Sequence, residues 1–444
     1  MKMTHCRRML CMLVTAVLAA GSASAQEILS LEETVRICLL NNFDIQIARN
    51  TAEAARNDIG LGTAGFLPTL DSQGNLIYDS TQYHGRDLTG GSRDYRTYGS
   101  ELSLSWTLFD GFRMFADNRR YRELAGAGDE QARDAIESSV VAAMSAYFDL
   151  VRQEQLLDVA RTNRDISQAR LELEEIRRSL GGASSTDLLN ARVSFNNDQT
   201  LLLEQELRAT IARKELNILL ARDPDVPLEV RQEIDVPELP LTLAELQERS
   251  RNESAALQAA RFRMQAASEQ VRVVDSAFWP KLVLGGQYGY TNRSALESSG
   301  AAATVFNRDS SRTLDAAVLL QLKFNIFNGN IDRINAQNAR LDAKSSALAH
   351  ADIKNRISGL MYELHRTLLK QVAVVELETE NTVTAEQNMQ LQKERYQTGA
   401  SDSLDFRDAQ VNVLRARSTL INARYLARIA LLNIQQLIGE IAIN

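Results

Sequence analysis

Residues 314–329 read LDAAVLLQLKFNIFNG, and the alternation in this stretch decides the fold. Apolar side chains occupy every second position from Ala316 to Ile326, while mostly polar residues, such as Asp315 and Lys323, fall between them. A period of two is typical of a β-strand with one apolar and one polar face. About ten such residues with an aromatic side chain near one end match the length and pattern of a membrane-spanning strand. The residues predicted to face the membrane are Leu320, Leu322, Phe324 and Ile326.

The same pattern occurs 218 positions earlier, where residues 98–111 read YGSELSLSWTLFDG. The residues predicted to face the membrane in this copy are Leu102, Leu104, Trp106 and Leu108. An amphipathic strand of a soluble β-sandwich fits the two stretches almost as well. The choice between a membrane sheet and a sandwich therefore depends on the rest of the chain.

The segments before these strands are duplicated too. Residues 30–65 and 243–277 each have the apolar spacing of one helix. The first is stopped by Phe66-Leu67-Pro68 and the second, 212 positions later, by Phe278-Trp279-Pro280. A further strand is expected after each proline.

Polar, glycine-containing stretches at 79–94 and 291–313 predict an exposed loop between the two strands of each half. The chain is therefore expected to be a tandem duplication of helix, strand, loop, strand, long helix, turn and helix. The predicted divisions are a first repeat at 26–221, a proline-rich connector at 222–241 and a second repeat at 242–444.

Long stretches without proline permit very long helices. No proline occurs between Thr69 and Asp223 or after Pro280. Apolar residues three and four apart, first from Ile136 to Val151 and then from Ile166 to Leu180, predict one helix from about residue 111 to 180. A second begins before Ile353 and ends at Gly399. A helix of about 70 residues is roughly 105 Å long, and its apolar stripe has to pack against other helices as a coiled coil.

Residues 1–25 are expected to be a secretory signal peptide, because a basic start and an apolar stretch precede the small residues Ala23-Ser24-Ala25. Two of the three cysteines lie in this segment, so Cys38 is left without a disulfide partner. The formal net charge is −7, and loss of the three cations of the signal makes it −10. An acidic chain of this kind is not expected to bind nucleic acid.

Four strands in one chain cannot form a membrane barrel alone. An open sheet edge leaves backbone groups unpaired in hydrocarbon, so a spanning sheet must close, and the smallest closed barrels have about eight strands. Three copies would give a twelve-stranded barrel. The expected fold class is mixed and mainly α, with long antiparallel coiled coils and four membrane strands per chain, assembled as a trimeric β-barrel and a periplasmic α-barrel.

The chain resembles the TolC family of outer-membrane efflux proteins. The resemblance rests on the two Pro-terminated motifs, on Leu108-Phe109-Asp110-Gly111 and Ile326-Phe327-Asn328-Gly329, and on residues 396–401 (YQTGAS) leading into 404–410 (LDFRDAQ). It covers nearly the whole chain after residue 25, and it is carried by the order and spacing of the motifs together.

The resemblance implies a passive channel in the outer membrane of a Gram-negative bacterium, surrounded by outer-membrane lipid and extending into the periplasm. The expected partners are two further copies of the chain, a periplasmic adaptor (membrane fusion) protein and an inner-membrane pump. Efflux of small molecules and type I protein secretion both use such a conduit, and the sequence does not decide between them.

Two aspartates follow the second helix break. Asp405 and Asp408 are three residues apart at the start of a helix and share one face. The resemblance implies that three copies of each would form acidic rings that narrow the tunnel. Acidic residues also favour a helix N-terminus because they complement the helix dipole, which is an alternative explanation.

Tyr396 matches a family position that helps to hold the tunnel mouth closed, and Asp187 matches its acidic partner, although an N-cap role also explains Asp187. Ser401 stands where some family members have a basic residue, so a charged contact is in doubt there. The residues expected to meet the adaptor are small: Gly181, Gly182, Gly399, Ala400 and Ser401. A tight helix turn would require similar residues.

An enzyme is not expected. His84, His350 and His365 show no metal-binding spacing, and the chain has neither a phosphate-binding glycine loop nor a dinucleotide fingerprint, so no catalytic residue, metal or cofactor is assigned. The alternative function is a soluble periplasmic coiled-coil adaptor or structural protein, which membrane fractionation would distinguish from a channel.

Overall fold

The computed structural model describes residues 28–83, 91–180, 185–231, 233–236, 239–298 and 311–441. The predicted signal peptide lies outside the described residues. The chain divides into two compact units, each built from separated stretches. The first takes the described parts of 1–47, 135–254 and 357–444, and the second takes those of 48–134 and 255–356. Each unit therefore combines stretches from both predicted repeats.

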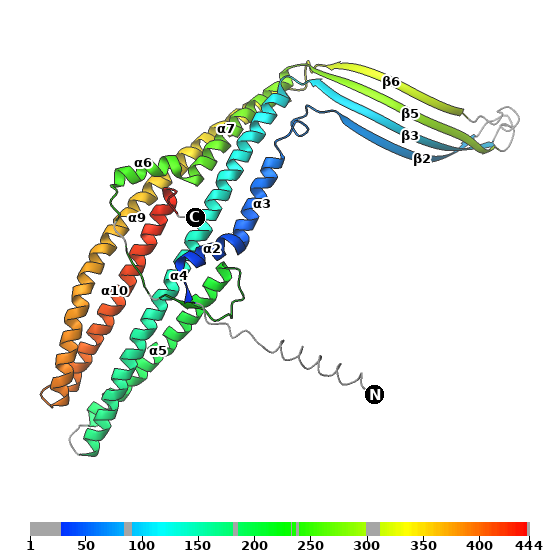
Figure 1. Cartoon of the computed structure of the whole chain (residues 1–444). Coiled ribbons are helices and arrows are strands. Elements are labelled where there is room, and N and C mark those ends of the chain that lie inside the picture. The colour runs from blue at the N-terminus through cyan, green and yellow to red at the C-terminus, as the bar shows by residue number, and fades with distance from the viewer. Residues whose placement is uncertain are drawn as a thin grey trace, which may run out of the picture. The chain divides into compact units, whose positions relative to one another are not determined.

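The second unit contains one antiparallel four-stranded sheet in the order β2-β3-β5-β6 (Figure 1). Its strands are β2 (Thr69–Tyr83), β3 (Gly91–Phe109), β5 (Lys281–Ser298) and β6 (Ser311–Lys323). The prediction of four strands is confirmed. Each predicted hairpin forms, and β3 pairs with β5, so the two hairpins join into one sheet with β2 and β6 at its edges.

The predicted loops at 79–94 and 291–313 are wrong in their extent, because strand pairing continues into both. Tyr78 donates a hydrogen bond to Asp94 on the neighbouring strand over 3.0 Å, and the guanidinium of Arg293 lies 3.9 Å from the ring centre of Tyr95. These cross-strand contacts stabilise polar positions in a strand. Residues 84–90 and 299–310 lie outside the described residues.

The strand β6 ends three residues earlier than its alternation predicts. Phe324 and Ile326 were expected in the strand, but both follow it. The reason is Pro280 on the opposite side, which has no N–H for a ladder hydrogen bond. Pairing between β5 and β6 accordingly stops at Lys281 and Lys323.

The two long helices are confirmed and have the same length. The helices α4 (Arg113–Ser179) and α9 (Ile331–Gln397) contain 67 residues each, and α5 (Ser185–Leu219) and α10 (Ser403–Leu437) contain 35 each. The two helices of each pair start 218 positions apart, the same offset as the sequence stretches 98–111 and 316–329 that precede the long helices. A helix of this length is about 100 Å long.

The shorter predicted helices are each broken in two. Within residues 30–65 lie α2 (Leu31–Asn41) and α3 (Phe43–Asn57), because Asn42 leaves the helical conformation and its side chain accepts a hydrogen bond from the N–H of Ile45. Residues 58–65 are turns and not helix. Residues 243–277 form α6 (Leu243–Glu253) and α7 (Ala255–Asp275), separated by the extended Ser254. Among the described residues, no helix combines the length and hydropathy needed to cross a bilayer.

Two apolar clusters form the core of the first unit. One surrounds Cys38 and Leu150 and includes the short parallel pair β1 (Ile28–Leu29) and β4 (Glu229–Val230). The other packs α6 against α9 and α10 around Leu246 and Met361. The first cluster joins the two repeats, because Leu432 of α10 packs among residues of the first repeat. The second cluster belongs to the second repeat and includes residues of the connector, such as Leu239.

Candidate functional site

The turn between α9 and α10 has the geometry of a glycine-terminated helix. Gly399 has a φ of 77°, which favours glycine. The N–H of Ala400 donates to the carbonyl of Arg395 over 2.8 Å, and the N–H of Gly399 donates to the carbonyl of Tyr396 over 3.2 Å. This is a Schellman motif, and it ends α9 sharply. Gly181 and Gly182, the predicted counterparts in the first repeat, lie outside the described residues.

Asp402, which sequence reasoning passed over, caps α10. Its side chain accepts hydrogen bonds from the N–H groups of Leu404 and Asp405, at 2.9 and 2.8 Å. Asp405 also accepts one from the Ser401 hydroxyl at 3.1 Å. Asp405 and Asp408 are both exposed in the single chain. Asp402 is the N-cap, and Asp405 lies in the first turn, where a carboxylate complements the helix dipole. The role of Asp405 and Asp408 in a tunnel stays a prediction.

Tyr396 is buried at the end of α9. Its hydroxyl donates a hydrogen bond to the carboxylate of Glu174 on α4, and its ring stacks on Phe406 of α10 with centres 5.4 Å apart. The guanidinium of Arg177 lies 4.4 Å from the ring centre and donates to the Tyr396 carbonyl over 2.5 Å. Burial, and then the Glu174 carboxylate, raise the pKa of the Tyr396 hydroxyl, which keeps it a protonated donor.

The predicted acidic partner Asp187 lies half-buried in the first turn of α5. In the single chain the carboxylate that accepts from the Tyr396 hydroxyl is that of Glu174, which sequence reasoning did not single out. A role of Asp187 at the mouth stays a prediction.

A second buried contact joins α5 to α10. Arg407 donates two hydrogen bonds to Asp198, at 2.6 and 3.0 Å, and the side chain of Asp198 has no exposed surface. Ser167 of α4 also donates to Asp198. Two parallel hydrogen bonds between a guanidinium and a carboxylate are strong and directional. All three helices are therefore held in one register at this point.

A further amide contact extends this network along α4. Gln410 donates to the backbone and side-chain oxygens of Asn163, at 2.9 and 2.8 Å. The network residues on α4 are spaced four, three, four and three apart, which is the heptad spacing of a coiled-coil seam. They are Asn163, Ser167, Arg170, Glu174 and Arg177.

Within the single chain, the apolar stripe predicted along this part of α4 is not the buried face of the helix. Ile176 is 57% exposed and Leu180 is 80% exposed, whereas Glu174 is 2% exposed. Polar residues are buried here because the other helices supply oppositely charged or hydrogen-bonding partners. The heptad spacing of polar residues was the signal in the sequence that could have indicated this seam.

The network is absent from the equivalent positions of the duplication. At an offset of 218, Glu174 corresponds to Gln392, Asp198 to Ala416, and Arg407 to Leu189. The duplication therefore does not repeat these contacts. The ion pair occurs only between α5 and α10, and the tyrosine contact only between α4 and α9, among these equivalent positions.

The sheet in the second unit has two different faces. Trp106, Leu284 and Leu320 are paired across three strands, so they lie on one face. The predicted residues Leu102, Leu104 and Leu322 lie on that face by the same alternation, while Leu108 lies at a register shift. The opposite face carries mainly polar side chains: Asp71, Gln73, Glu101, Ser103, Gln287, Asp315 and Gln321.

A family model described as "Outer membrane efflux protein" matches residues 35–222 and 246–440. The chain belongs to the outer membrane efflux protein family. The two matched segments fall within the two predicted repeats and leave most of the proline-rich connector unmatched. Members of this family are channel proteins of the outer membrane, so a mainly helical chain with one two-faced sheet is the expected architecture.

This outer membrane efflux protein also has similar curated relatives. It is 23% identical over 410 residues to the alkaline protease secretion protein AprF of Pseudomonas aeruginosa, covering 89% of this chain and 82% of AprF. It is 21% identical over 430 residues to the outer membrane protein TolC of Escherichia coli, covering 95% of this chain and 84% of TolC.

Solved structures of outer membrane channels share the fold. The CmeC channel of Campylobacter jejuni matches 92% of this chain and 85% of its own, with a TM-score of 0.76 and 17% identity. The MtrE channel of Neisseria gonorrhoeae matches 92% of this chain and 88% of its own, with a TM-score of 0.72 and 17% identity. At these identities the likeness concerns the fold alone.

Proposed function

We propose that this outer membrane efflux protein works as a homotrimer in which three four-stranded sheets close one twelve-stranded barrel. The observation that carries the proposal is the sheet itself. Its edges β2 and β6 have no partner strand within the described chain, and one of its faces is apolar. In hydrocarbon both edges must be paired, and the edge β6 of one copy can pair with the edge β2 of the next.

The polar face of each sheet then lines a water-filled channel, and the long helices of the three copies line a tunnel in the periplasm. Residues 1–25 are removed on export, and the repeats 26–221 and 242–444 contribute one hairpin and one pair of long helices each. Leu102, Leu104, Trp106, Leu108, Leu320 and Leu322 face lipid, while Phe324 and Ile326 lie at its periplasmic border.

The channel passes cargo that an inner-membrane pump delivers through a periplasmic adaptor. The adaptor meets Gly399, Ala400 and Ser401 at the turn between α9 and α10, and Gly181 and Gly182 in the sequence between α4 and α5. The names of two relatives support an export role: AprF is an alkaline protease secretion protein, and TtgC of Pseudomonas putida is a toluene efflux pump outer membrane protein. Protein secretion and small-molecule efflux both remain candidates for the cargo, and the protein performs no catalysis itself.

The contacts of Tyr396 with Glu174 and of Arg407 with Asp198 hold the tunnel mouth closed. Asp405 and Asp408 of three copies form acidic rings there, and Asp187 lies near them at the start of α5.

The test is the mass of the detergent-extracted particle by light scattering, together with the membrane fraction from which it is extracted. We expect a trimer that is extracted from the outer membrane. A water-soluble monomer in the periplasmic fraction would contradict the proposal and favour the soluble coiled-coil alternative.

A further inference from the structure

Two lysines lie directly opposite each other at the base of the second hairpin. Lys281 is the first residue of β5 and Lys323 is the last residue of β6, and the two are register partners. By alternation they share the face of Gln321 and Thr107, which is the polar face. Like charges in directly opposite positions destabilise a sheet. We call Lys281 and Lys323 the lysine pair.

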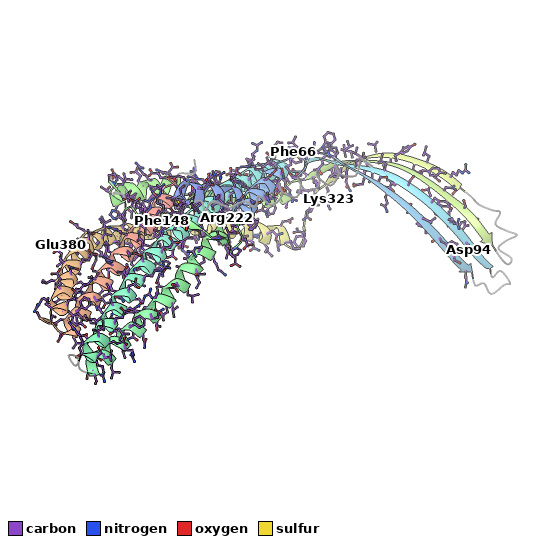
Figure 2. The ribbon with its side chains drawn as sticks, turned by 60° about the horizontal axis from the view of Figure 1, so that its bottom comes forward. Phe66, Asp94, Phe148, Arg222, Lys323 and Glu380 are labelled. Atoms are coloured by element: carbon purple, nitrogen blue, oxygen red, sulfur yellow. The ribbon has the colours of Figure 1, made fainter. Side chains whose placement is uncertain are left out.

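The lysine pair borders a cavity of about 780 Å³ in the second unit. Thr107 of the polar face lines the same cavity, as do the amide side chains of Asn325, Asn335 and Asn338. Figure 2 shows Lys323 at the end of the sheet that joins the helices, and Asp94 near the opposite end. The two ammonium groups therefore lie where the polar face of the sheet meets the helices.

The carboxylates in the cavity wall form their hydrogen bonds and ion pairs with groups other than the lysine pair. Asp110 accepts a hydrogen bond from a backbone N–H at the start of α4, and Asp117 forms ion pairs with two arginines of α4. Asp332 accepts a hydrogen bond from Asn325 over 2.9 Å. Asp342 is exposed. Within the described part of the chain, neither lysine forms an ion pair.

The first hairpin shows that this charge is not needed to build the strand ends. The corresponding register partners there are Thr69, which follows Pro68 as Lys281 follows Pro280, and Ser105, which lies 218 positions before Lys323. Both are neutral. The duplication has therefore placed two lysines, neither of which forms an ion pair within the described residues, at one of two equivalent positions.

We propose that the lysine pair binds an anionic group, a carboxylate or a phosphate, of a solute inside the channel. The proposal rests on the proposed function, since the polar face becomes a channel wall only in the closed barrel. In the trimer three pairs form a ring of six ammonium groups at the periplasmic end of the barrel. An ammonium group is a point charge that binds phosphate and carboxylate oxygens. The low-dielectric protein wall of a channel focuses the electric field of these charges into the water-filled interior.

The test uses inorganic tripolyphosphate as a blocker of single channels in planar bilayers. It is added on the side of the membrane to which the β-barrel opens, opposite the long helices, at low salt, where screening is weak. The variant is Lys281→Gln with Lys323→Gln. We expect the blocking constant to rise roughly tenfold, because six attractive charges are removed. Lys370→Gln, which removes an exposed lysine of α9, is the matched control and should block like the wild type.

Two further variants make the result specific. Lys281→Arg with Lys323→Arg should retain the block, while Thr69→Lys with Ser105→Lys should strengthen it. A wild-type blocking constant in the glutamine variant, with normal trimer mass and conductance, would overturn the anion site and leave the channel intact. A chain that forms no trimer and no channel would overturn the proposed function together with this inference. If the double glutamine variant does not assemble, the single variants serve, and each should weaken the block by a smaller factor.

Discussion

The hydroxyl of Tyr396, near the end of α9, donates a hydrogen bond to the carboxylate of Glu174, near the end of α4. Each residue is only 2% exposed. The contact therefore joins the ends of two long helices from different repeats. Because both groups are buried, neither can readily form a hydrogen bond with water instead.

Loss of this contact should loosen the helix ends. Tyr396→Phe removes the hydroxyl donor of the buried Glu174 carboxylate and leaves it the 3.6 Å ion pair with Arg177, which should cost about 1–3 kcal/mol. We expect a lower melting temperature of the extracted particle and a larger single-channel conductance. Tyr362→Phe is the matched control, because Tyr362 lies on the same helix and is 53% exposed. Because the pKa of Tyr396 is raised, its hydroxyl should not ionise near pH 10, where an exposed tyrosine does. The ultraviolet absorbance change of tyrosine ionisation near pH 10 should therefore be the same in Tyr396→Phe and in the wild type.

The Arg407–Asp198 pair should contribute more to stability than ion pairs on the surface. Arg407→Ala leaves Asp198 buried and uncompensated, which should cost about 3–5 kcal/mol. Arg208→Ala is the control on α5, since the 3.7 Å pair of Arg208 and Glu204 is mostly exposed and should contribute less than about 1 kcal/mol. Thermal unfolding of the extracted trimer measures both. Equal melting temperatures for the two variants would contradict the assignment of a buried pair.

The acidic rings can be separated from helix capping. Asp405→Asn with Asp408→Asn should weaken cation preference and raise the blocking constant of hexaamminecobalt(III) added on the periplasmic side. Asp402→Ala should instead lower stability by about 1 kcal/mol through loss of the N-cap and leave the block largely unchanged. Unchanged single-channel records of the double variant would show that the two aspartates do not form the limiting rings.

Two glycines at equivalent positions should respond differently to alanine. Gly111 and Gly329 have φ values of 72° and 71°, so alanine carries a backbone cost of about 1–2 kcal/mol at either. At Gly111 a Cβ would also lie 2.6 Å from the Ser276 carbonyl oxygen and the Trp279 Cβ, whereas at Gly329 nothing lies within 4 Å. We expect Gly111→Ala to cost about 2–5 kcal/mol in all. The yield and melting temperature of trimers should fall more for Gly111→Ala than for Gly329→Ala.

Cys38 should be inert in the folded protein and should report unfolding. Its thiol is completely buried, and burial raises its pKa from 9.0 to about 11. A maleimide should label it only on denaturation. The raised pKa means that the folded state holds the proton more tightly, so this contribution to stability is complete below pH 9 and is lost as the pH rises through 11. Rapid labelling of native protein at pH 7 would contradict the burial.

The parts of the fold that depend on local pattern could be predicted from the sequence. The lack of proline and the three-four spacing around Val140 and Tyr147 predicted the long helices, and both residues are buried. Alternation at Leu102, Leu104 and Trp106 predicted the apolar face of the sheet. Such patterns can be recognised in the sequence because the apolar residues of these elements lie on one face and the polar residues on the other.

The parts that depend on partners from other segments could not be predicted. Strand pairing extends through polar residues such as Asp94 because the opposite strand supplies contacts, and β6 stops at Lys323 because Pro280 lies opposite. The burial of Glu174 and Asp198 was not predicted, because burial of a carboxylate becomes favourable only when Tyr396 and Arg407 are placed beside them.

The helices α4 and α9 are equal in length, and so are α5 and α10. Their ends therefore stay at matching levels only if all four helices change in length together. One heptad inserted into α4 alone would displace its end by about 10 Å and separate Glu174 from Tyr396. Seven residues added to all four helices at equivalent levels would leave every contact near the turns in register. A change in the distance that these helices span therefore requires matching insertions in both halves of the gene. A single-repeat protein assembled from six identical copies would need only one such insertion.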